Sequence, residues 1–186
     1  ISIDTTKAAV ASKALEAGAD IINDISALQK DPEMISVVQR TAVPVIIMHM
    51  QGSPADMQIN PEYYDVTIDI LNFFKERIDW LKGRGVDAGR IIIDPGIGFG
   101  KTLQHNISIL KNLAKFSSLK VPLMLGHSRK RFLGDITGVD HEEERDLASG
   151  VVSALCCTKG ISIVRVHNVA ATRQALLIAE TLHSVS

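Results

Sequence analysis

Short apolar runs that end beside polar or charged residues recur along this chain, and segments of helical character separate them. The six runs are Ile1–Ile3 before Asp4, Ile21–Ile22 before Asn23, Val45–Met48 before His49, Ile91–Ile93 before Asp94, Leu123–Leu125 before Gly126, and Ile161–Val166 around Arg165. Such runs with helices between them are typical of repeated βα units. Right-handed crossovers make the resulting sheet parallel, and strands that are apolar on both faces indicate that helices cover it.

Capping, proline and glycine signals predict where the helices lie. The predicted ranges are Lys7–Ala17 with Thr5 or Thr6 as cap, Pro32 to about Arg40, Glu62 to about Gly83 behind Pro61, Asn106–Phe116, Glu142–Thr158 and Ala171–Leu182. The order is therefore a strand followed by a helix, repeated six times.

This order fits either a closed barrel or an open doubly wound sheet. All six runs end in polar chemistry, whereas an open sheet concentrates its ligands at one switch point. We therefore predict an α/β fold of the TIM (β/α)8 type, with six of its eight βα units in residues 1–186 as one domain. The two other units are expected on the amino-terminal side, because the chain begins in a strand-like run without methionine.

Composition excludes several classes of function. The net charge is -1 and aromatic residues make up 4% of the chain, which argues against a nucleic-acid partner. No apolar run reaches the ~20 residues of a membrane span, and the amino terminus does not resemble a signal peptide. Cys156 and Cys157 are adjacent and cannot join distant segments, which fits a reducing, cytoplasmic compartment.

The segment Asp94–Lys101 combines a carboxylate at a strand end with a glycine-rich turn. An ionised carboxylate can accept two parallel hydrogen bonds from an N–H/NH2 edge, such as a pterin presents. The alternative is a glycine-rich turn with a capping aspartate. A phosphate-binding loop is disfavoured, because its first glycine would fall at Pro95.

Asn23 and Asp4 end two further runs. An asparagine can donate and accept hydrogen bonds at once, which suits the mixed edge of a heterocycle. The alternatives are an Asx turn at Asn23 and a helix cap at Asp4. Met48 can line an apolar slot for a flat ring, whereas we interpret His49 as a core histidine.

Two segments near the carboxyl terminus offer anion-binding groups. Ser128 and Lys130 follow a strand and precede an expected short helix, whose amides and dipole attract anions. The alternative is a solvated basic turn. Arg165 and His167 are two residues apart in an expected strand, so they share one face and form a candidate phosphate site. His105, His141 and His183 are assigned no role.

Together these motifs resemble the dihydropteroate synthase family of the folate pathway. The matching segments occur in the family's order: Ser2–Thr5, Ile21–Asp24, Met48–Gly52, Asp94–Lys101, Ser128–Lys130 and Arg165–His167. The resemblance implies a (β/α)8 barrel that condenses 6-hydroxymethyl-7,8-dihydropterin diphosphate with 4-aminobenzoate, giving 7,8-dihydropteroate and diphosphate with the help of Mg2+. Sulfonamides would compete as mimics of the aminobenzoate.

The resemblance also implies residue roles. The residues implied to bind the pterin are Asp4, Asn23, Met48, Asp94, Phe99, Lys130 and Arg165. Arg165 and His167 would bind diphosphate, and Ser128 and Lys130 would receive the aminobenzoate. Lys130 and Arg165 would carry the catalysis, with no protein nucleophile, through positioning and stabilisation of the leaving group.

The chain departs from the family at its front, where the first two strands and their metal-ligating asparagine are absent. We therefore expect no Mg2+ ligand within this chain and leave the activity of the chain alone open. One alternative is a methyltetrahydrofolate-binding methyltransferase domain, and another is a non-catalytic pterin-binding module. The expected partners are small molecules, with a homodimer as a further possibility.

Overall fold

The computed structural model describes residues 1–52, 57, 59 and 61–184. Strands and α-helices alternate along the chain, in the order β1 (Ser2–Asp4), α1 (Ala8–Glu16), β2 (Ile21–Asp24), α2 (Met34–Arg40), β3 (Val45–Met48), α3 (Val66–Lys82), β4 (Ile91–Asp94), α4 (Leu103–Lys111), β5 (Met124–Leu125), α5 (Arg131–Thr137), α6 (Asp146–Cys156), β6 (Ile163–Val164) and α7 (Val169–Ser184). Short 3-10 segments are η1 (Ala88–Arg90), η2 (Leu113–Leu119) and η3 (Glu142–Arg145).

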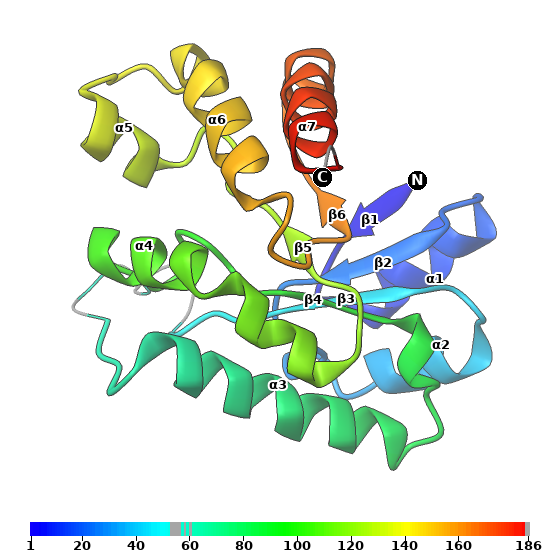
Figure 1. The fold of residues 1–186 in the computed structure, drawn as a ribbon. Coiled ribbons are helices and arrows are strands. Elements are labelled where there is room, and N and C mark those ends of the chain that lie inside the picture. Colours follow the sequence, from blue (N-terminus) through cyan, green and yellow to red (C-terminus); the bar gives the residue numbers. More distant parts are fainter. Residues whose placement is uncertain (53–56, 58, 60, 185–186) are drawn as a thin grey trace.

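The strands pair in parallel and in sequence order. β1 to β4 form one sheet and β5 pairs with β6, while a bridge between Ile93 and Leu123 connects the two groups. In Figure 1 the strands run through the centre and the helices surround them, with α3 along one side and α6 and α7 on another. This arrangement confirms the α/β class and fits the predicted partial barrel.

Side chains alternate between the two faces of this curved sheet. Those facing the helices, such as Ile22 and Ile47, belong to the main core. Those facing inward form a smaller cluster of Ile46, Ile92 and Met124 with Ile21 and Ile163 packed against it. Because the side-chain period of a strand is two residues, the next inward positions are Asn23, Met48, Asp94, Gly126 and Arg165. An apolar layer thus lies beneath a largely polar one at the carboxyl ends of the strands.

Helix boundaries differ from the sequence prediction where a side-chain cap decides them. α3 begins at Val66 and not at Glu62, because the Asp65 carboxylate accepts hydrogen bonds from the amides of Thr67 and Ile68. α4 begins at Leu103 and not at Asn106, because Thr102 and His105 form a reciprocal capping box. The predicted Thr5 or Thr6 cap of α1 is wrong, since Lys7 holds that position without a side-chain cap bond.

Other predicted elements are shorter than expected. The predicted helix Glu142–Thr158 divides into η3 and α6, and Asn106–Phe116 divides into α4 and η2. The predicted strand Ile161–Val166 contributes only Ile163–Val164. Among the described residues, no helix has the length and hydropathy needed to cross a membrane.

Candidate functional site

The polar side chains predicted from the strand ends meet at the mouth of the partial barrel. The register pairs Asp4 with Asn23 and Met48 with Asp94, and the Arg165 amide donates to the Leu125 carbonyl beside β5. Each of these positions follows the inward apolar layer. The local sequence and the strand pairing therefore bring distant residues to one place.

Arg165 joins two acidic side chains across this mouth. Its Nη1 lies 3.4 Å from Asp4 Oδ2, and its Nη2 lies 3.7 Å from Asp94 Oδ2. The Arg165 side chain is 40% exposed, the Asp4 side chain 65% and that of Asp94 only 1%. The guanidinium thus connects a solvated carboxylate on β1 with a buried one on β4, and part of it remains open to a ligand.

Asn23 presents a buried acceptor beside this ion pair. Its Nδ2 donates to Asp4 Oδ1 at 2.8 Å, which fixes the orientation of the amide. Its Oδ1 has no hydrogen-bond partner among the described residues, although Asn23 is only 1% exposed. A buried carbonyl oxygen without a partner is costly, so a ligand N–H is the natural group to satisfy it.

The charge of Asp94 depends on opposing influences. Burial raises its pKa, while Lys130, the Gly96 amide, Arg165 and Lys101 act in the other direction. The Gly96 N–H donates to Asp94 Oδ1 at 2.8 Å. Two parallel hydrogen bonds from a ligand would favour the ionised carboxylate further.

Lys130 reaches across the mouth from the loop before α5. Its ammonium donates to the Ile97 carbonyl and lies 4.0 Å from the centre of the Phe99 ring, in cation–π contact. Burial lowers the pKa of Lys130 to about 8, and Asp94 offsets part of that shift. Gly98 leaves room for this side chain, because an added Cβ would lie 3.0 Å from Lys130 Cδ.

A cavity of about 410 Å³ collects the predicted anion-binding residues. It is lined by Asp4, Gly126, Ser128, Lys130, Arg165, Val166 and His167. Ser128 Oγ lies 3.0 Å from His167 Nδ1 and accepts a hydrogen bond from the His167 amide. The predicted Arg165–His167 pair therefore shares one cavity, although both residues follow β6 instead of lying in it.

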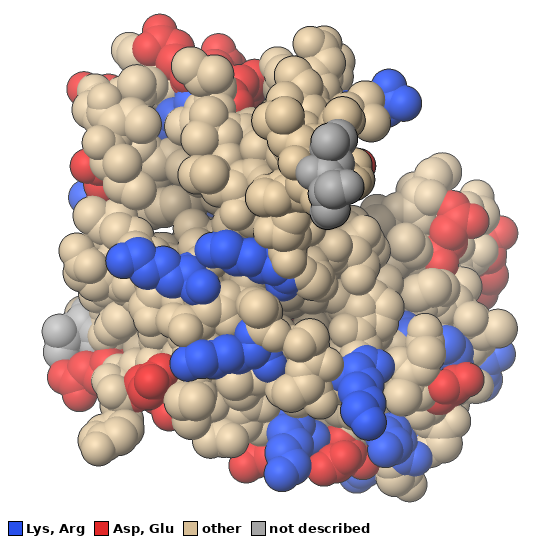
Figure 2. All heavy atoms as spheres, viewed as in Figure 1, with Lys and Arg blue, Asp and Glu red and all other residues tan. Residues whose placement is uncertain are grey.

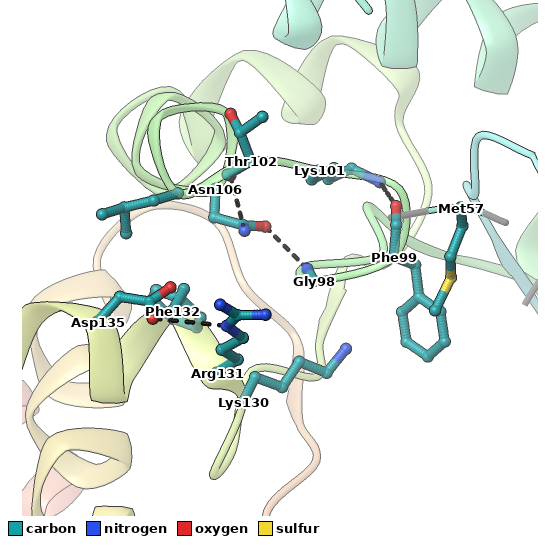
Figure 3. A pocket seen from close by; sticks show the side chains of 11 residues that line it. Met57, Gly98, Phe99, Lys101, Thr102, Asn106, Lys130, Arg131, Phe132 and Asp135 are labelled. Atoms are coloured by element: carbon teal, nitrogen blue, oxygen red, sulfur yellow. Dashed lines mark hydrogen bonds and ion pairs between the residues drawn. The ribbon is translucent and has the colours of Figure 1, made fainter. Parts of the chain in front are cut away.

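A second cavity, of about 480 Å³, lies on the other side of Lys130, between the β4 loop, α4 and α5 (Figure 3). Phe99 and Lys130 form part of its wall, and Arg131 and Asp135 stand 3.6 Å apart at its edge. Lys130 lines this cavity and the one that contains Arg165. Its ammonium is therefore a boundary between two adjoining spaces.

Sequence reasoning gave Lys101 no separate role, yet the structure buries it at 3% exposure. Its ammonium donates to the carbonyls of Phe99 and His49 at 2.9 and 3.3 Å, and lies 3.1 Å from His49 Nδ1. Burial lowers the pKa of Lys101 to about 7, and burial with the Lys101 charge lowers that of His49 to about 3. His49 is therefore a neutral buried histidine, and Lys101 ties the β4 loop to the end of β3.

Met48 lies beside Asp94 in the strand register but is nearly fully buried. It lines a separate cavity of about 240 Å³ with Met50 and Phe73, among others. The structure thus brings Asp4, Asn23, Asp94, Lys130 and Arg165 together, and Met48 lies in the same inward layer, on the strand between those that carry Asn23 and Asp94. No sequence signal indicated the buried amide of Asn106, which accepts a hydrogen bond from the Gly98 N–H at 2.8 Å.

The donor set does not form a metal centre within the part of the chain that the structure describes. No group of three histidine, cysteine, aspartate or glutamate side chains there is arranged to hold a metal ion. Asp4 and Asp94 both face the Arg165 guanidinium. The residues present therefore do not account for a Mg2+ ion.

Comparison with known proteins agrees with this geometry. Residues 1–167 match the family described as pterin binding enzyme. The dihydropteroate synthase of Synechocystis is 41% identical over 182 residues, covering 98% of this chain and 63% of that protein. The chain thus spans less than two thirds of that curated relative.

Two solved structures share the fold at high similarity. A sulfonamide complex of Yersinia pestis dihydropteroate synthase superposes with a TM-score of 0.95 at 38% identity, covering 100% of this chain and 67% of that one. Xanthomonas albilineans dihydropteroate synthase in complex with 7,8-dihydropteroate gives 0.91 at 39% identity, covering 100% and 69%. With the family match and the polar mouth of the barrel, these similarities establish that the chain belongs to the pterin-binding enzyme family.

Proposed function

We propose that this chain forms most of a dihydropteroate synthase. The reaction joins 6-hydroxymethyl-7,8-dihydropterin diphosphate to 4-aminobenzoate. The bond between the pterin methylene and the diphosphate oxygen breaks, a bond forms between that carbon and the arylamine nitrogen, and the amine loses a proton. The products are 7,8-dihydropteroate and diphosphate. The relative from Xanthomonas albilineans binds this pteroate.

One observation supports the pterin assignment most directly. Among the described residues the buried Asn23 Oδ1 has no hydrogen-bond partner, and the buried Asp94 carboxylate lies at the same barrel mouth. We assign Asp94 to the N3–H and 2-amino edge of the pterin, and Asn23 with Asp4 to the opposite nitrogen edge. An aminopyrimidine offers donors on both sides, and these side chains offer acceptors. Met48 and Phe99 remain proposed ring contacts.

The leaving group is assigned to the cavity that Arg165 and His167 line. A guanidinium can give two parallel hydrogen bonds to phosphate oxygens. As the C–O bond breaks, negative charge grows on the diphosphate, so these groups stabilise the transition state more than the ground state. No covalent intermediate with the protein is required.

The aminobenzoate is assigned to the neighbouring cavity beside Phe99, with Lys130 between the two substrates. Its carboxylate needs a donor, and the proposed one is Ser128 with the loop before α5, although Ser128 lines the adjoining cavity of Arg165, so the carboxylate would have to reach past Lys130. The Ser128 hydroxyl already contacts His167, so this role requires the hydroxyl to serve both groups. A sulfonamide would compete with aminobenzoate here, as the complex of the Yersinia pestis relative suggests.

Three further features are part of the proposal. Mg2+ would assist the departure of diphosphate, with ligands supplied from outside the described residues. The cytoplasm is the proposed compartment, in keeping with free Cys156 and Cys157. A homodimer would cover the exposed apolar stripe of Leu147, Val151 and Leu155 on α6. In Figure 2 the region where Figure 1 shows α6 and α7 is largely uncharged, with acidic side chains along its upper edge. Sedimentation of the native protein would test the dimer.

Turnover of the native protein tests the reaction. Chromatography should detect dihydropteroate from the two substrates, and a sulfonamide should raise the KM for aminobenzoate. Tight binding of methyltetrahydrofolate without this turnover would favour a methyltransferase domain. Binding of pterin diphosphate without release of diphosphate would favour a non-catalytic module.

A further inference from the structure

The loop that carries Ser128 and Lys130 has an alternating arrangement. Ser128 and Lys130 line the cavity of Arg165. The alternate residues, His127 and Arg129, contact α6 instead. His127 Nε2 lies 2.9 Å from the Ser149 carbonyl, and the Arg129 amide donates to Ser149 Oγ at 3.0 Å. One side of this loop is therefore attached to α6, while the other faces the candidate substrates.

Arg129 has a backbone conformation that non-glycine residues rarely adopt. Its φ is 59°, in the left-handed region, which is strained for a non-glycine residue. Such a conformation persists only where its surroundings hold it. Here the Arg129 amide bonds Ser149, its carbonyl accepts from Arg145 Nη1 at 3.0 Å, and its guanidinium meets Asp146 at 2.7 and 3.0 Å.

Asp146 connects this loop to a second one. Its Oδ2 also accepts a hydrogen bond from Asn168 Nδ2 at 3.1 Å, and Asn168 directly follows His167. The same carboxylate at the start of α6 thus holds Arg129, next to Ser128 and Lys130, and Asn168, next to His167. The Arg129 guanidinium lowers the pKa of Asp146, which keeps the carboxylate charged.

We propose that Asp146 is a positioning residue that sets the spacing between the Ser128–Lys130 loop and His167. This inference rests on the proposed function, which assigns diphosphate to the cavity that Ser128, Lys130 and His167 line. Asp146 contacts neither substrate itself. Its removal should release the strained Arg129 and the Asn168 side chain. His167 would then be held to Ser128 only by their direct contacts, so the anion-binding groups would be positioned less firmly. A misplacement of about 1 Å can cost about 100-fold in rate.

The test uses the native protein with Asp146→Ala, and Asn168→Asp as a second variant. Asn168→Asp keeps the acceptor for the Ala171 amide but replaces the donor to Asp146 with a like charge. Glu143→Ala is the matched control, because it removes an exposed carboxylate near Arg129 without breaking either bond. Calorimetry measures the affinity for inorganic diphosphate and for a bare pterin, and kinetics measure kcat and KM.

Both variants should weaken diphosphate binding by about tenfold or more and raise the KM of the diphosphate substrate, while bare pterin binding, which depends mainly on Asp94 and Asn23, changes much less. Glu143→Ala should match the wild type. Wild-type diphosphate affinity and KM in folded Asp146→Ala and Asn168→Asp would overturn the positioning role. Equal losses for pterin and diphosphate would also overturn it. If Asp146→Ala does not fold, Asn168→Asp decides alone. Failure of the wild type to bind pterin would instead overturn the proposed function.

Discussion

Arg165 and Asp94 face one another at the mouth of the barrel, with Nη2 and Oδ2 3.7 Å apart. Asp94 ends β4 and Arg165 follows β6, and these strands lie on the two sides of β5. Gly126, after β5, stands between them and offers no side chain. The pair combines a cation that is partly open to solvent with a buried carboxylate. Such an arrangement can hold a ligand that presents donors at one end and negative charge at the other.

The buried carboxylate should be essential for pterin binding. Asp94→Ala leaves ring donors without partners in a site that excludes water, so we expect the affinity for a bare pterin to fall by about 100-fold or more. Calorimetry or pterin fluorescence measures this loss. Asp87→Asn is the control. Asp87 precedes η1, at the opposite end of β4 from the mouth, so this variant should bind the pterin normally. Normal binding by Asp94→Ala would show that its assigned role is wrong.

The guanidinium should matter more for diphosphate than for the ring. Arg165→Ala removes a bidentate phosphate donor, so the KM of the diphosphate substrate should rise by at least about tenfold while bare pterin binding changes much less. Arg40→Ala, at the end of α2, tests for the general effect of losing an arginine. Equal losses for the two ligands would contradict the phosphate role of Arg165.

Binding of the pterin should depend on pH through Asp94. Burial raises the pKa of this carboxyl, whereas the proposed hydrogen bonds need the ionised form. Affinity should therefore stay constant above this raised pKa and fall as the pH drops through it, with uptake of a proton on release of the ligand. Calorimetry between pH 8 and about pH 4 measures the profile. In Asp94→Asn the residual pterin affinity should no longer depend on pH in this range. A pH profile like that of the wild type would show that another group causes the dependence.

The strand ends were predictable because two rules act together. A period of two residues places Asn23 and Asp94 on the same side as the inward apolar layer, and parallel pairing in sequence order brings the strand ends to one edge. Asp4, Asn23, Asp94 and Arg165 could thus be grouped from the sequence. In the structure the hydrogen bond from Asn23 to Asp4 and the ion pairs of Arg165 with Asp4 and Asp94 join these four side chains.

Other features could not be read from the sequence because they depend on contacts between distant segments. Nothing in the pattern around Lys101 distinguishes a buried ammonium from a solvated one, since two of its three polar contacts are with His49, which follows β3. The left-handed Arg129 is held by Arg145 of η3 and Ser149 of α6. The predicted start of α3 at Glu62 is also wrong, because the side-chain cap at Asp65, and not Pro61, sets the first turn.

The ion pair between Arg165 and Asp94 should require a glycine at position 126. An added Cβ would lie 3.0 Å from Arg165 Nη2 and 3.3 Å from Asp94 Oδ2. Gly126→Ala should therefore displace the guanidinium and weaken binding of the diphosphate substrate by about tenfold, while thermal stability changes little. Gly150→Ala, whose Cβ would meet only Ala175 at 3.8 Å, is the control. Full affinity in Gly126→Ala would mean that the space beside Gly126 does not determine the position of the Arg165 guanidinium.

Lys101 should make folding stability depend on pH. Burial lowers its pKa from 10.5 to about 7, so between these values the unfolded chain binds a proton that the folded protein lacks. Stability from this group therefore rises with pH across that window, by up to about 1.4 kcal/mol per pH unit. Lys101→Met removes the effect, so the free energy of unfolding of the wild type minus that of the variant should increase from pH 7 to about pH 10. Urea unfolding at several pH values measures this difference. A difference that stays flat or decreases would contradict the buried, proton-losing ammonium.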